Sequence, residues 1–309
     1  MANNDSLDIL LTTNESFAQH CAVCIKSLQL NHPNIKINVK IASLELTGTA
    51  KQNLYSMSDD NANINIDIVD FDKTKLDALP QIGNYTKDIY LRLWVDEFFQ
   101  DTNIDRVLYL DADTIVVDSL ITLWELPLND NILAAVDIPE STSHNRCHLP
   151  KEFNYFNSGV ILFNIKLWKQ ENCLQQIITF LHENKEIALN PDQDALNGLF
   201  HDRRITLDYT YNAISPFFRK KGFKSISIED LSTIQKNVKI VHFNGRARPW
   251  IYGCNHPYKN QYLRYLRLTP WKKQKLLNKS FKSFIKRHIS LLFKLDSFVK
   301  IPRNLIKGK

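Results

Sequence analysis

Short apolar runs alternate with helical patterns over the first third of the chain. The runs lie at residues 7–12 (LDILLT), 35–42 (IKINVKIA), 64–69 (INIDIV) and 107–110 (VLYL). Between them, apolar residues recur at helical spacing over 17–28, 44–60 and 88–99. Strands that alternate with helices predict an α/β fold, in which helices cover both faces of a mostly parallel sheet. Two later runs, 159–164 and 238–243, predict further strands, and residues 168–200 between them predict a helical region.

The charge of the chain is concentrated at its C-terminal end. Residues 1–255 contain no Gly/Pro/Ser-rich linker, which predicts one domain there and an appended region at 256–309. Residues 271–309 hold twelve Lys or Arg and one acid, a balance of +11, so the rest of the chain carries −5 of the net +6. Apolar residues recur in this tail at helical spacing, at Leu277, Phe281, Phe284, Ile285, Leu292 and Leu295. A basic amphipathic helix is typical of a segment that lies on anionic lipid. A solvated helix packed on the body is the alternative, whereas nucleic-acid binding lacks any supporting motif.

The cysteines and the N-terminus indicate a cellular compartment. The five cysteines are scattered, and Cys21 and Cys24 lie on the apolar side of a helical pattern, which favours buried thiols over a zinc site. The N-terminus lacks the basic region of a signal peptide, and no run of about 18 apolar residues is present. We expect a reduced, cytoplasmic protein that is peripheral on the inner face of the cytoplasmic membrane.

Two aspartates, Asp111 and Asp113, directly follow the run at 107–110. Residues i and i+2 of an extended segment point to the same side, and ligands bind beyond the carboxyl ends of parallel strands. Two adjacent carboxylates repel each other unless a cation lies between them. Mg²⁺ or Mn²⁺ suits such a pair and would bring a diphosphate with it. The same spacing recurs at 70–72 and 192–194, so a turn capped by Asp is a competing interpretation.

Other polar residues stand where elements begin or end. Asn157 and Ser158 precede the run at 159–164, and His242 ends the run at 238–243. The residues after His242 include Gly245 and two arginines, a combination suited to phosphate. Asp192 and Asp194 fall at a helix start that begins with proline, where ordinary charge complementing the helix dipole is the alternative.

Together these motifs resemble the retaining glycosyltransferases of family eight, which include bacterial lipopolysaccharide and lipooligosaccharide galactosyl- and glucosyltransferases and glycogenin. The matching stretches follow the family's order: DILLTTNESFAQH (8–20), IYLRL (89–93), VLYLDADTIVVDSLITLW (107–124), YFNSGVILFNIKLW (155–168), DQDALN (192–197) and VHFNGRARPW (241–250). The resemblance implies a GT-A fold and a UDP-galactose or UDP-glucose donor. It also implies a manganese ion, with magnesium as the alternative, held by Asp111, Asp113 and His242.

The resemblance further implies roles for donor-binding residues. The loop after the first strand would hold the uridine through Thr12, Asn14, Ser16 and Phe17, with Asn14 near the uracil where the family commonly has Asp. Ala112, between the two acids, would also contact the donor. Arg92 and Asn157 would face the sugar and the diphosphate, and Gly245 and Arg248 would bind the β-phosphate.

The resemblance places the catalytic residues at 192–194. Gln193 occupies the position of the family's candidate for the retention step and is flanked by Asp192 and Asp194. An amide is a poor nucleophile, which favours attack from the face that the leaving group departs from. In that mechanism Gln193 stabilises the cationic sugar and Asp192 binds its hydroxyls.

The predicted function is a retaining hexosyltransferase that moves galactose or glucose from a UDP-sugar to a saccharide acceptor, such as a lipopolysaccharide or lipooligosaccharide core or another surface glycan. Two alternatives stay open at this stage: a metal-dependent nucleotidyltransferase that uses the same acids, and a non-enzymatic scaffold with a membrane-binding basic tail. The sequence leaves open galactose versus glucose, the acceptor and linkage, the oligomeric state, and same-face attack versus a covalent intermediate.

Overall fold

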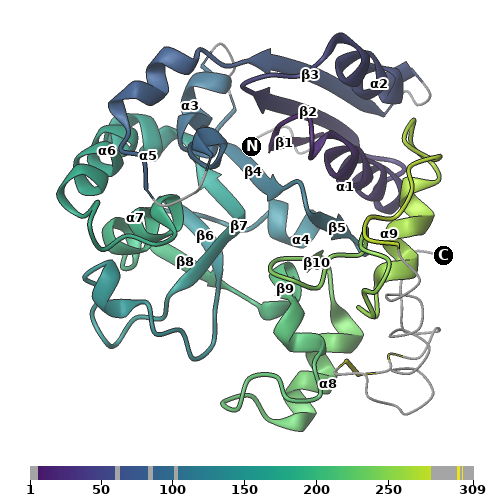
Figure 1. Cartoon of the computed structure of the whole chain (residues 1–309). Coiled ribbons are helices and arrows are strands. Elements are labelled where there is room, and N and C mark those ends of the chain that lie inside the picture. The colour runs from purple at the N-terminus through teal and green to yellow at the C-terminus, as the bar shows by residue number, and fades with distance from the viewer. Residues whose placement is uncertain are drawn as a thin grey trace.

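The computed structural model describes residues 6–59, 63–82, 86–100, 104–279, 298, 299 and 301. Within these residues, seven strands form the main sheet in the order β3-β2-β1-β4-β7-β6-β8 (Figure 1). They are β1 (Ser6–Thr13), β2 (Lys36–Ser43), β3 (Ile64–Asp70), β4 (Arg106–Asp111), β6 (Leu133–Asp137), β7 (Phe156–Asn164) and β8 (Arg204–Leu207). All the predicted runs of the first third form neighbouring strands, which confirms the predicted α/β class.

The sheet is mostly parallel, as predicted, with one antiparallel strand near its middle. β3, β2, β1 and β4 pair in parallel, and so do β6 and β8, whereas β7 is antiparallel to both of its neighbours. Because β7 runs in the opposite direction, its first residues lie at the same edge of the sheet as the carboxyl end of β4. The start of β7 and the end of β4 thus meet where ligands bind in sheets of this kind.

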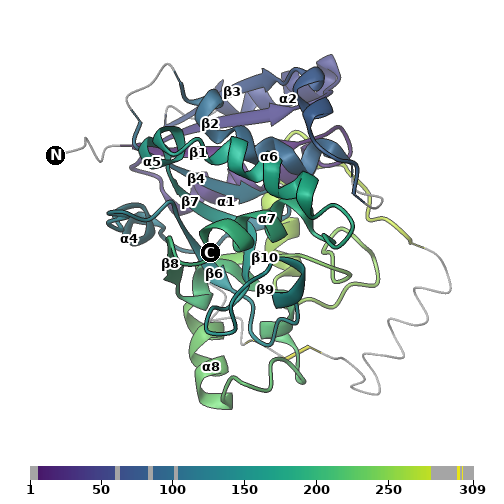
Figure 2. The same ribbon diagram turned by 90° about the vertical axis from the view of Figure 1, so that its left-hand side faces the viewer.

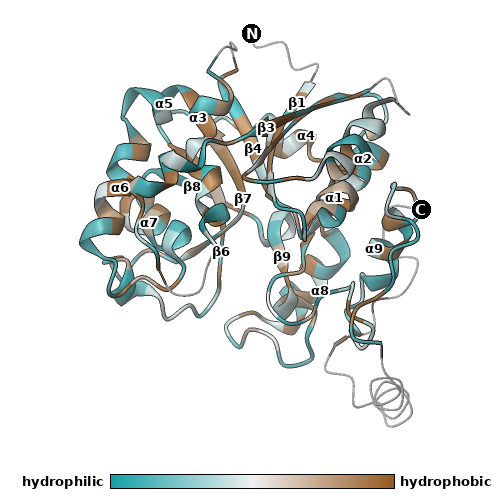
Figure 3. Cartoon of the chain, turned by 45° about the horizontal axis from the view of Figure 1, so that its top comes forward, coloured by the Kyte–Doolittle hydropathy of each residue, from teal (hydrophilic) through white to brown (hydrophobic). Residues whose placement is uncertain are grey.

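Side chains alternate along the strands between two buried layers. One layer contains Tyr109 and Phe163 and is covered by α5 (Ile165–Gln170), α6 (Cys173–Glu183) and α7 (Pro191–Phe200). The other contains Leu108 and Leu162 and is covered by α1 (Ala18–Asn31), α2 (Gly48–Asp59) and α4 (Ile121–Trp124). Figure 2 shows α5, α6 and α7 in front of the sheet, and Figure 3 shows the apolar residues along β4 and β7 between the helices. Burial on both faces explains why β4 and β7 read as continuous apolar runs, whereas β2 and β3 alternate with polar residues.

A second, smaller sheet lies beside α1. It contains β5 (Thr114–Val116), β10 (Ile240–His242) and β9 (Ala213–Ile214), in the order β5-β10-β9. A hydrophobic cluster joins this sheet to α9 (Lys259–Leu266), which packs against α1 through Tyr262 and Tyr265. α8 (Ile228–Asn237) completes this side of the molecule (Figure 1). The described residues after 255 therefore pack on the body, and the boundary between 1–255 and 256–309 stays a prediction.

Three predicted boundaries were wrong for local reasons. The helix expected from residue 44 begins at Gly48, because the Thr47 hydroxyl accepts a hydrogen bond from Ala50 N and so caps the helix. The helical region expected from residue 168 begins at Ile165 and contains three helices, which are separated at Asn172, whose φ of 51° is left-handed, and again by residues 184–190. The strand expected from residue 159 begins at Phe156, because Phe156 pairs with Asp137 of β6.

The helical pattern predicted over 88–99 is confirmed, and most of the segment winds more tightly than an α-helix. The segment folds as the 3₁₀ helix η2 (Lys87–Trp94) followed by the short α3 (Val95–Phe98). A 3₁₀ helix repeats every three residues, so Thr86, Ile89 and Arg92 all face one cavity. This winding gives the segment its place in the candidate site.

The remaining described elements are short 3₁₀ helices: η1 (Lys73–Ala78), η3 (His144–Arg146), η4 (Tyr209–Asn212) and η5 (Ser215–Phe218). Five free cysteines are buried, which confirms the buried thiols predicted for Cys21 and Cys24. Among the described residues, no helix has the length and apolar character needed to cross a membrane. Residues 271–279 of the predicted tail helix are described and are not helical; of its six apolar positions only Leu277 lies among them, and it forms an isolated bridge with Ile251. The apolar residues predicted at 281–295 lie outside the described residues.

Candidate active site

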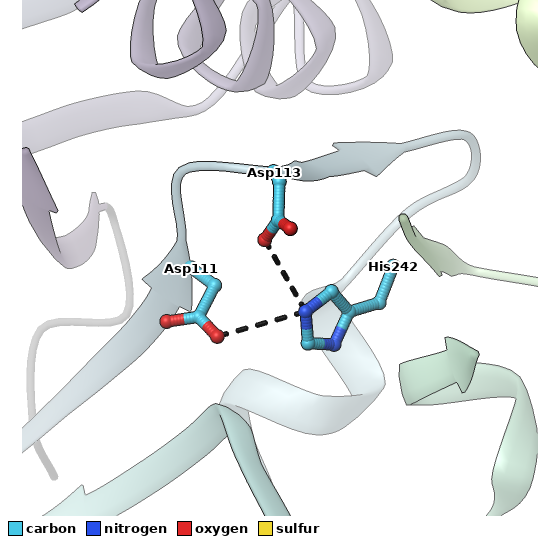
Figure 4. Close-up of side chains that lie close together, drawn as sticks. All are labelled: Asp111, Asp113 and His242. Carbon is cyan, nitrogen blue, oxygen red and sulfur yellow. Dashed lines mark ion pairs between the residues drawn. The ribbon is translucent and has the colours of Figure 1, made fainter. Parts of the chain in front are cut away.

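Asp111, Asp113 and His242 form a cluster at the carboxyl end of β4 (Figure 4). Each residue offers one ligand atom, and these atoms lie within 4.8 Å of one another. His242 Nε2 is 3.2 Å from Asp113 Oδ1 and 3.6 Å from Asp111 Oδ2. The predicted metal ligands are therefore brought together from segments far apart in the sequence.

Backbone pairing of the small sheet places His242 against the two acids. Thr114 of β5 pairs with His242 of β10, and Phe243 N donates to Asp113 O at 3.0 Å. The expectation that Asp111 and Asp113 share one extended segment was wrong, because Ala112 and Asp113 form a turn between β4 and β5. The carboxylates converge because the chain turns toward β10, which carries the imidazole.

Gly159 provides the space for this cluster. A Cβ atom at Gly159 would lie 2.3 Å from His242 Cε1 and 2.7 Å from Asp111 Oδ2, closer than real Cβ atoms approach. A glycine is therefore required for the acid and the imidazole to meet. Two carboxylates, one imidazole and this close packing fit a divalent ion that accepts both oxygen and nitrogen.

Asn212 fixes which ring nitrogen of His242 faces the acids. His242 Nδ1 is 2.9 Å from Asn212 Oδ1, an acceptor, so Nδ1 carries the proton and Nε2 offers its lone pair. Asn212 Nδ2 donates to Asn157 Oδ1 at 2.7 Å, and Asn157 Nδ2 donates to Gln193 Oε1 at 3.0 Å. A chain of hydrogen bonds thus connects the metal-ligand cluster to Gln193.

Arg92 joins the cluster to the start of α7. Its guanidinium lies 3.0 Å from Asp111 Oδ1 and 3.4 Å from Asp192 Oδ2, and it donates to the Ser158 carbonyl at 2.9 Å. The group also lies over the Tyr109 ring, 4.5 Å from its centroid, and the Tyr109 hydroxyl donates to Asp111 Oδ1 at 2.6 Å. These contacts hold two acids and a buried cation in fixed positions.

Burial and neighbouring charges shift the pKa values of these groups in opposite directions. Burial lowers the pKa of Arg92, but Asp111 and Asp192 outweigh it and keep the pKa above its ordinary value. Burial raises the pKa of Asp192, and Arg92 only partly offsets this. Burial also raises the pKa of Asp113, but His242 lowers it by more. The pKa of His242 is raised, because Asp113 and Asp111 outweigh the effect of burial.

The residues at 192–194 differ in what their side chains contact. Gln193 Oε1 accepts hydrogen bonds from Asn157 Nδ2, Ser158 N and Ser158 Oγ, and Gln193 Nε2 donates to the Tyr155 hydroxyl. Asp194 is fully buried, and its carboxylate accepts from Tyr155 and from Leu189 N and Asn190 N and pairs with Arg146. Gln193 therefore adjoins the cluster through Asn157, whereas Asp194 holds the start of α7.

A cavity of about 340 Å³ extends from the two acids to the loop after β1. It is lined by Thr12, Thr13, Asn14, Phe17, Thr86, Asp88, Ile89, Arg92, Asp111, Ala112 and Asp113. The predicted donor-binding residues in this list are Thr12, Asn14, Phe17, Arg92, Asp111 and Ala112. Ser16 is absent from it, and its hydroxyl donates to Asn14 Oδ1. Gly245 and Arg248 are absent too and lie on the loop after β10, where Gly245 has φ 77° and its carbonyl accepts from Arg248 Nε.

Sequence reasoning missed Asn212, Tyr109 and Asp88, and it noted Ser158 without giving it a role. Tyr109 had a signal, since it stands two residues before Asp111 on the same side of a buried strand. Asn212 had none, because an asparagine before a short strand is common in turns. Its role depends on η4 packing beside β10, which a local pattern does not reveal.

Comparisons with known proteins agree with this geometry. Residues 8–254 match glycosyl transferase family 8. A lipopolysaccharide 1,2-glucosyltransferase of Escherichia coli K12 is 25% identical over 295 residues, covering 94% of this chain and 86% of the relative. A lipopolysaccharide 1,3-galactosyltransferase of Salmonella typhimurium LT2 is 27% identical over 283 residues, which cover 89% of this chain and 82% of that relative. The crystal structure of galactosyltransferase LgtC with donor and acceptor sugar analogs shares the fold, with a TM-score of 0.74 and 22% identity, covering 91% of this chain and 100% of that one.

The fold and the matched family define a glycosyltransferase of the GT-A type. The chain belongs to glycosyl transferase family 8, since the match extends over most of its length. The resemblance found in the sequence motifs is thereby confirmed.

Proposed function

We propose that the chain is a retaining hexosyltransferase that moves glucose or galactose from a UDP-sugar to a saccharide acceptor. The observation that carries the proposal is the cluster of Asp111, Asp113 and His242 at one end of the cavity, beside Arg92. Relatives in enteric bacteria are named for glucosyl or galactosyl transfer to lipopolysaccharide. We therefore propose a surface glycan, such as a lipopolysaccharide or lipooligosaccharide core, as the acceptor class.

Asp111, Asp113 and His242 Nε2 would hold the divalent ion, with Mn²⁺ preferred over Mg²⁺ because one ligand is nitrogen. When bound, the ion supplies Lewis-acid stabilisation of the departing diphosphate. Gly245 allows the loop after β10 to turn at φ 77°, and Arg248 offers a guanidinium to the β-phosphate.

The sugar would lie between the acids and the start of α7. Asn157 and Asp192 would bind its hydroxyls, and Arg92 would contact both the sugar and the diphosphate. Asn157 Nδ2 and Ser158 N already donate to Gln193 Oε1 and fill both of its acceptor positions, which supports same-face attack over a covalent intermediate on this amide. Gln193 would then stabilise the cationic sugar through the negative end of its amide dipole, and Asp194 would act as a positioning residue through Tyr155.

The experiment is an assay of UDP release from UDP-glucose and UDP-galactose, with Mn²⁺ or with EDTA. We expect Mn²⁺-dependent release from one of the two donors, and a product of retained anomeric configuration by NMR when a core oligosaccharide is added. Release of pyrophosphate when UTP and a hexose 1-phosphate are supplied in place of the UDP-sugar would instead indicate a nucleotidyltransferase. If the protein does not bind UDP, the result would favour the alternative of a non-enzymatic scaffold.

We also propose that the basic tail associates with anionic membrane at the cytoplasmic face. The tail holds twelve Lys or Arg, and each basic residue near such a surface contributes up to about 1 kcal/mol of binding free energy. Deleting the tail would be a poor test, since Phe298 packs against His256, with ring centroids 5.3 Å apart, and Val299 N donates to Phe218 O. The better variant replaces Lys282, Lys286 and Arg287 with Gln. We expect less of this variant than of the original protein to sediment with vesicles of anionic lipid. The original protein is expected not to sediment with neutral vesicles. Equal sedimentation of both proteins would contradict the proposal.

A further inference from the structure

The end of the cavity away from Asp113 is built by a contact between its two walls. Asn14, on the loop after β1, donates through Nδ2 to Asp88 Oδ2 at 2.7 Å, and Asp88 lies in the first turn of η2. Both residues line the cavity, together with the Phe17 ring. This end therefore presents one amide, one carboxylate and one aromatic ring.

The hydrogen bonds of Asn14 fix what each group can offer to a ligand. Asn14 Oδ1 already accepts from Ser16 Oγ at 2.7 Å and from Phe17 N at 3.2 Å. An amide oxygen has two acceptor positions and its nitrogen has two hydrogens, so Asn14 retains one N–H to donate. Among the described residues, the Asp88 carboxylate accepts only from Asn14. Asp88 is consequently the acceptor at this end of the cavity, and Asn14 is a donor beside it.

A donor beside an acceptor complements the edge of a uracil ring, on which N3–H stands next to a carbonyl oxygen. If the diphosphate lies at Asp111 and Asp113, as in the proposed function on which this inference rests, the nucleoside occupies the end at Asn14 and Asp88. We propose that Asp88 is a specificity-determining residue of the donor site. Its carboxylate accepts the N3–H of uracil, Asn14 Nδ2 donates to the neighbouring carbonyl, and Phe17 covers the ring.

The test pairs a change in the ligand with a change in the protein. Titration calorimetry with Mn²⁺ compares UDP with N3-methyl-UDP, which lacks the N3–H, on the original protein and on Asp88→Ala. A hydrogen bond to a charged acceptor predicts that N3-methylation weakens binding to the original protein by about 10- to 100-fold. Asp88→Ala is expected to weaken UDP binding by a similar factor, with no additional loss for N3-methyl-UDP.

Two further variants separate this contact from general effects. Asp77→Ala removes the same charge from an exposed position near Lys87 and outside the cavity, and is expected to bind UDP as the original protein does. Asp88→Asn retains one acceptor oxygen and is expected to recover part of the UDP affinity. Thermal unfolding of each variant checks that the fold is retained.

Equal losses from N3-methylation in the original protein and in Asp88→Ala would overturn the role of Asp88 and leave the proposed function standing. Tighter binding of CDP or GDP than of UDP by the original protein would overturn the assignment of the base. Absence of binding for all three nucleotides would overturn both this inference and the proposed function.

Discussion

The imidazole of His242 donates through Nδ1 to Asn212 Oδ1 at 2.9 Å, and this contact directs Nε2 at Asp111 and Asp113. Such partners fix the tautomer of a ligating histidine and raise its affinity for metal. We expect Asn212→Ala to weaken Mn²⁺ binding by about 10- to 100-fold. Calorimetric titration with Mn²⁺ alone measures this.

The matched variant is Asn212→Asp. It keeps the acceptor for His242 Nδ1 but loses the donor to Asn157 Oδ1. We expect Mn²⁺ affinity near that of the original protein and a lower rate of UDP release. Unchanged Mn²⁺ affinity in Asn212→Ala would show that the contact does not support the ligand.

Asp113→Asn is expected to abolish most transfer while the fold persists. The variant removes one charged ligand, and several kcal/mol of metal stabilisation correspond to a rate loss of about 10²- to 10³-fold or more. Asp72→Asn, in the exposed triplet at 70–72, is the control and should react normally, because Asp72 only caps η1. Initial rates of UDP release from the two variants and the original protein measure this effect. Near-normal turnover in Asp113→Asn would rule out the metal assignment.

Gly159→Ala tests whether space at the start of β7 is required. The added Cβ would overlap His242 and Asp111, so we expect loss of Mn²⁺ binding and a destabilisation of about 1–3 kcal/mol. Gly48→Ala is the control, because nothing lies within 4 Å of its Cβ position. That change should leave Mn²⁺ binding unaltered. Denaturant unfolding and metal titration together measure both effects, and normal Mn²⁺ affinity in Gly159→Ala would refute the close packing.

The stability of the protein should fall in acid partly through His256. Burial, aided by Arg219, lowers the pKa of His256 to about 3, whereas an unfolded histidine titrates near 6.5. The unfolded state therefore binds the proton first, and stability is lost as pH falls below about 6.5 and on toward 3, by up to about 1.4 kcal/mol per pH unit.

In the original protein, Tyr258 N donates a hydrogen bond to His256 Nδ1. His256→Asn removes the titrating imidazole and keeps an acceptor for this N–H. The variant loses packing and should be less stable at pH 7. Between pH 7 and pH 4 its free energy of unfolding should nevertheless decline less than that of the original protein. Parallel declines in urea unfolding would assign the acid sensitivity to other groups.

The sequence allowed β1, β2, β3, β4 and β7 of the main sheet and the members of the candidate metal cluster to be predicted, because these leave local signals, whereas β6 and β8 were not predicted. Buried strands such as β4 are continuous apolar runs, and Asp111, Asp113 and His242 stand directly at their ends. Helix limits were predicted less well where a single side chain decides them, as Thr47 does for α2.

Contacts across the chain were not predictable in the same way. Arg92 meets Asp192 only because η2 packs against α7, and Asn212 meets His242 only because η4 lies beside β10. Asp88 gave no signal, since an acid in a polar segment before a helix is ordinary. The roles of such residues can be inferred only from the residues that lie near them in the folded structure.

The pairing of β5 with β10 has a consequence for how the enzyme matures. Only three residue pairs hold these strands in register, and they join parts of the chain that lie more than a hundred positions apart. Loop closure over such a span is slow relative to local structure formation. We therefore expect Mn²⁺ binding to appear late during refolding, after most of the main sheet has formed. The rate of Mn²⁺ binding would then report the rate of the last folding step.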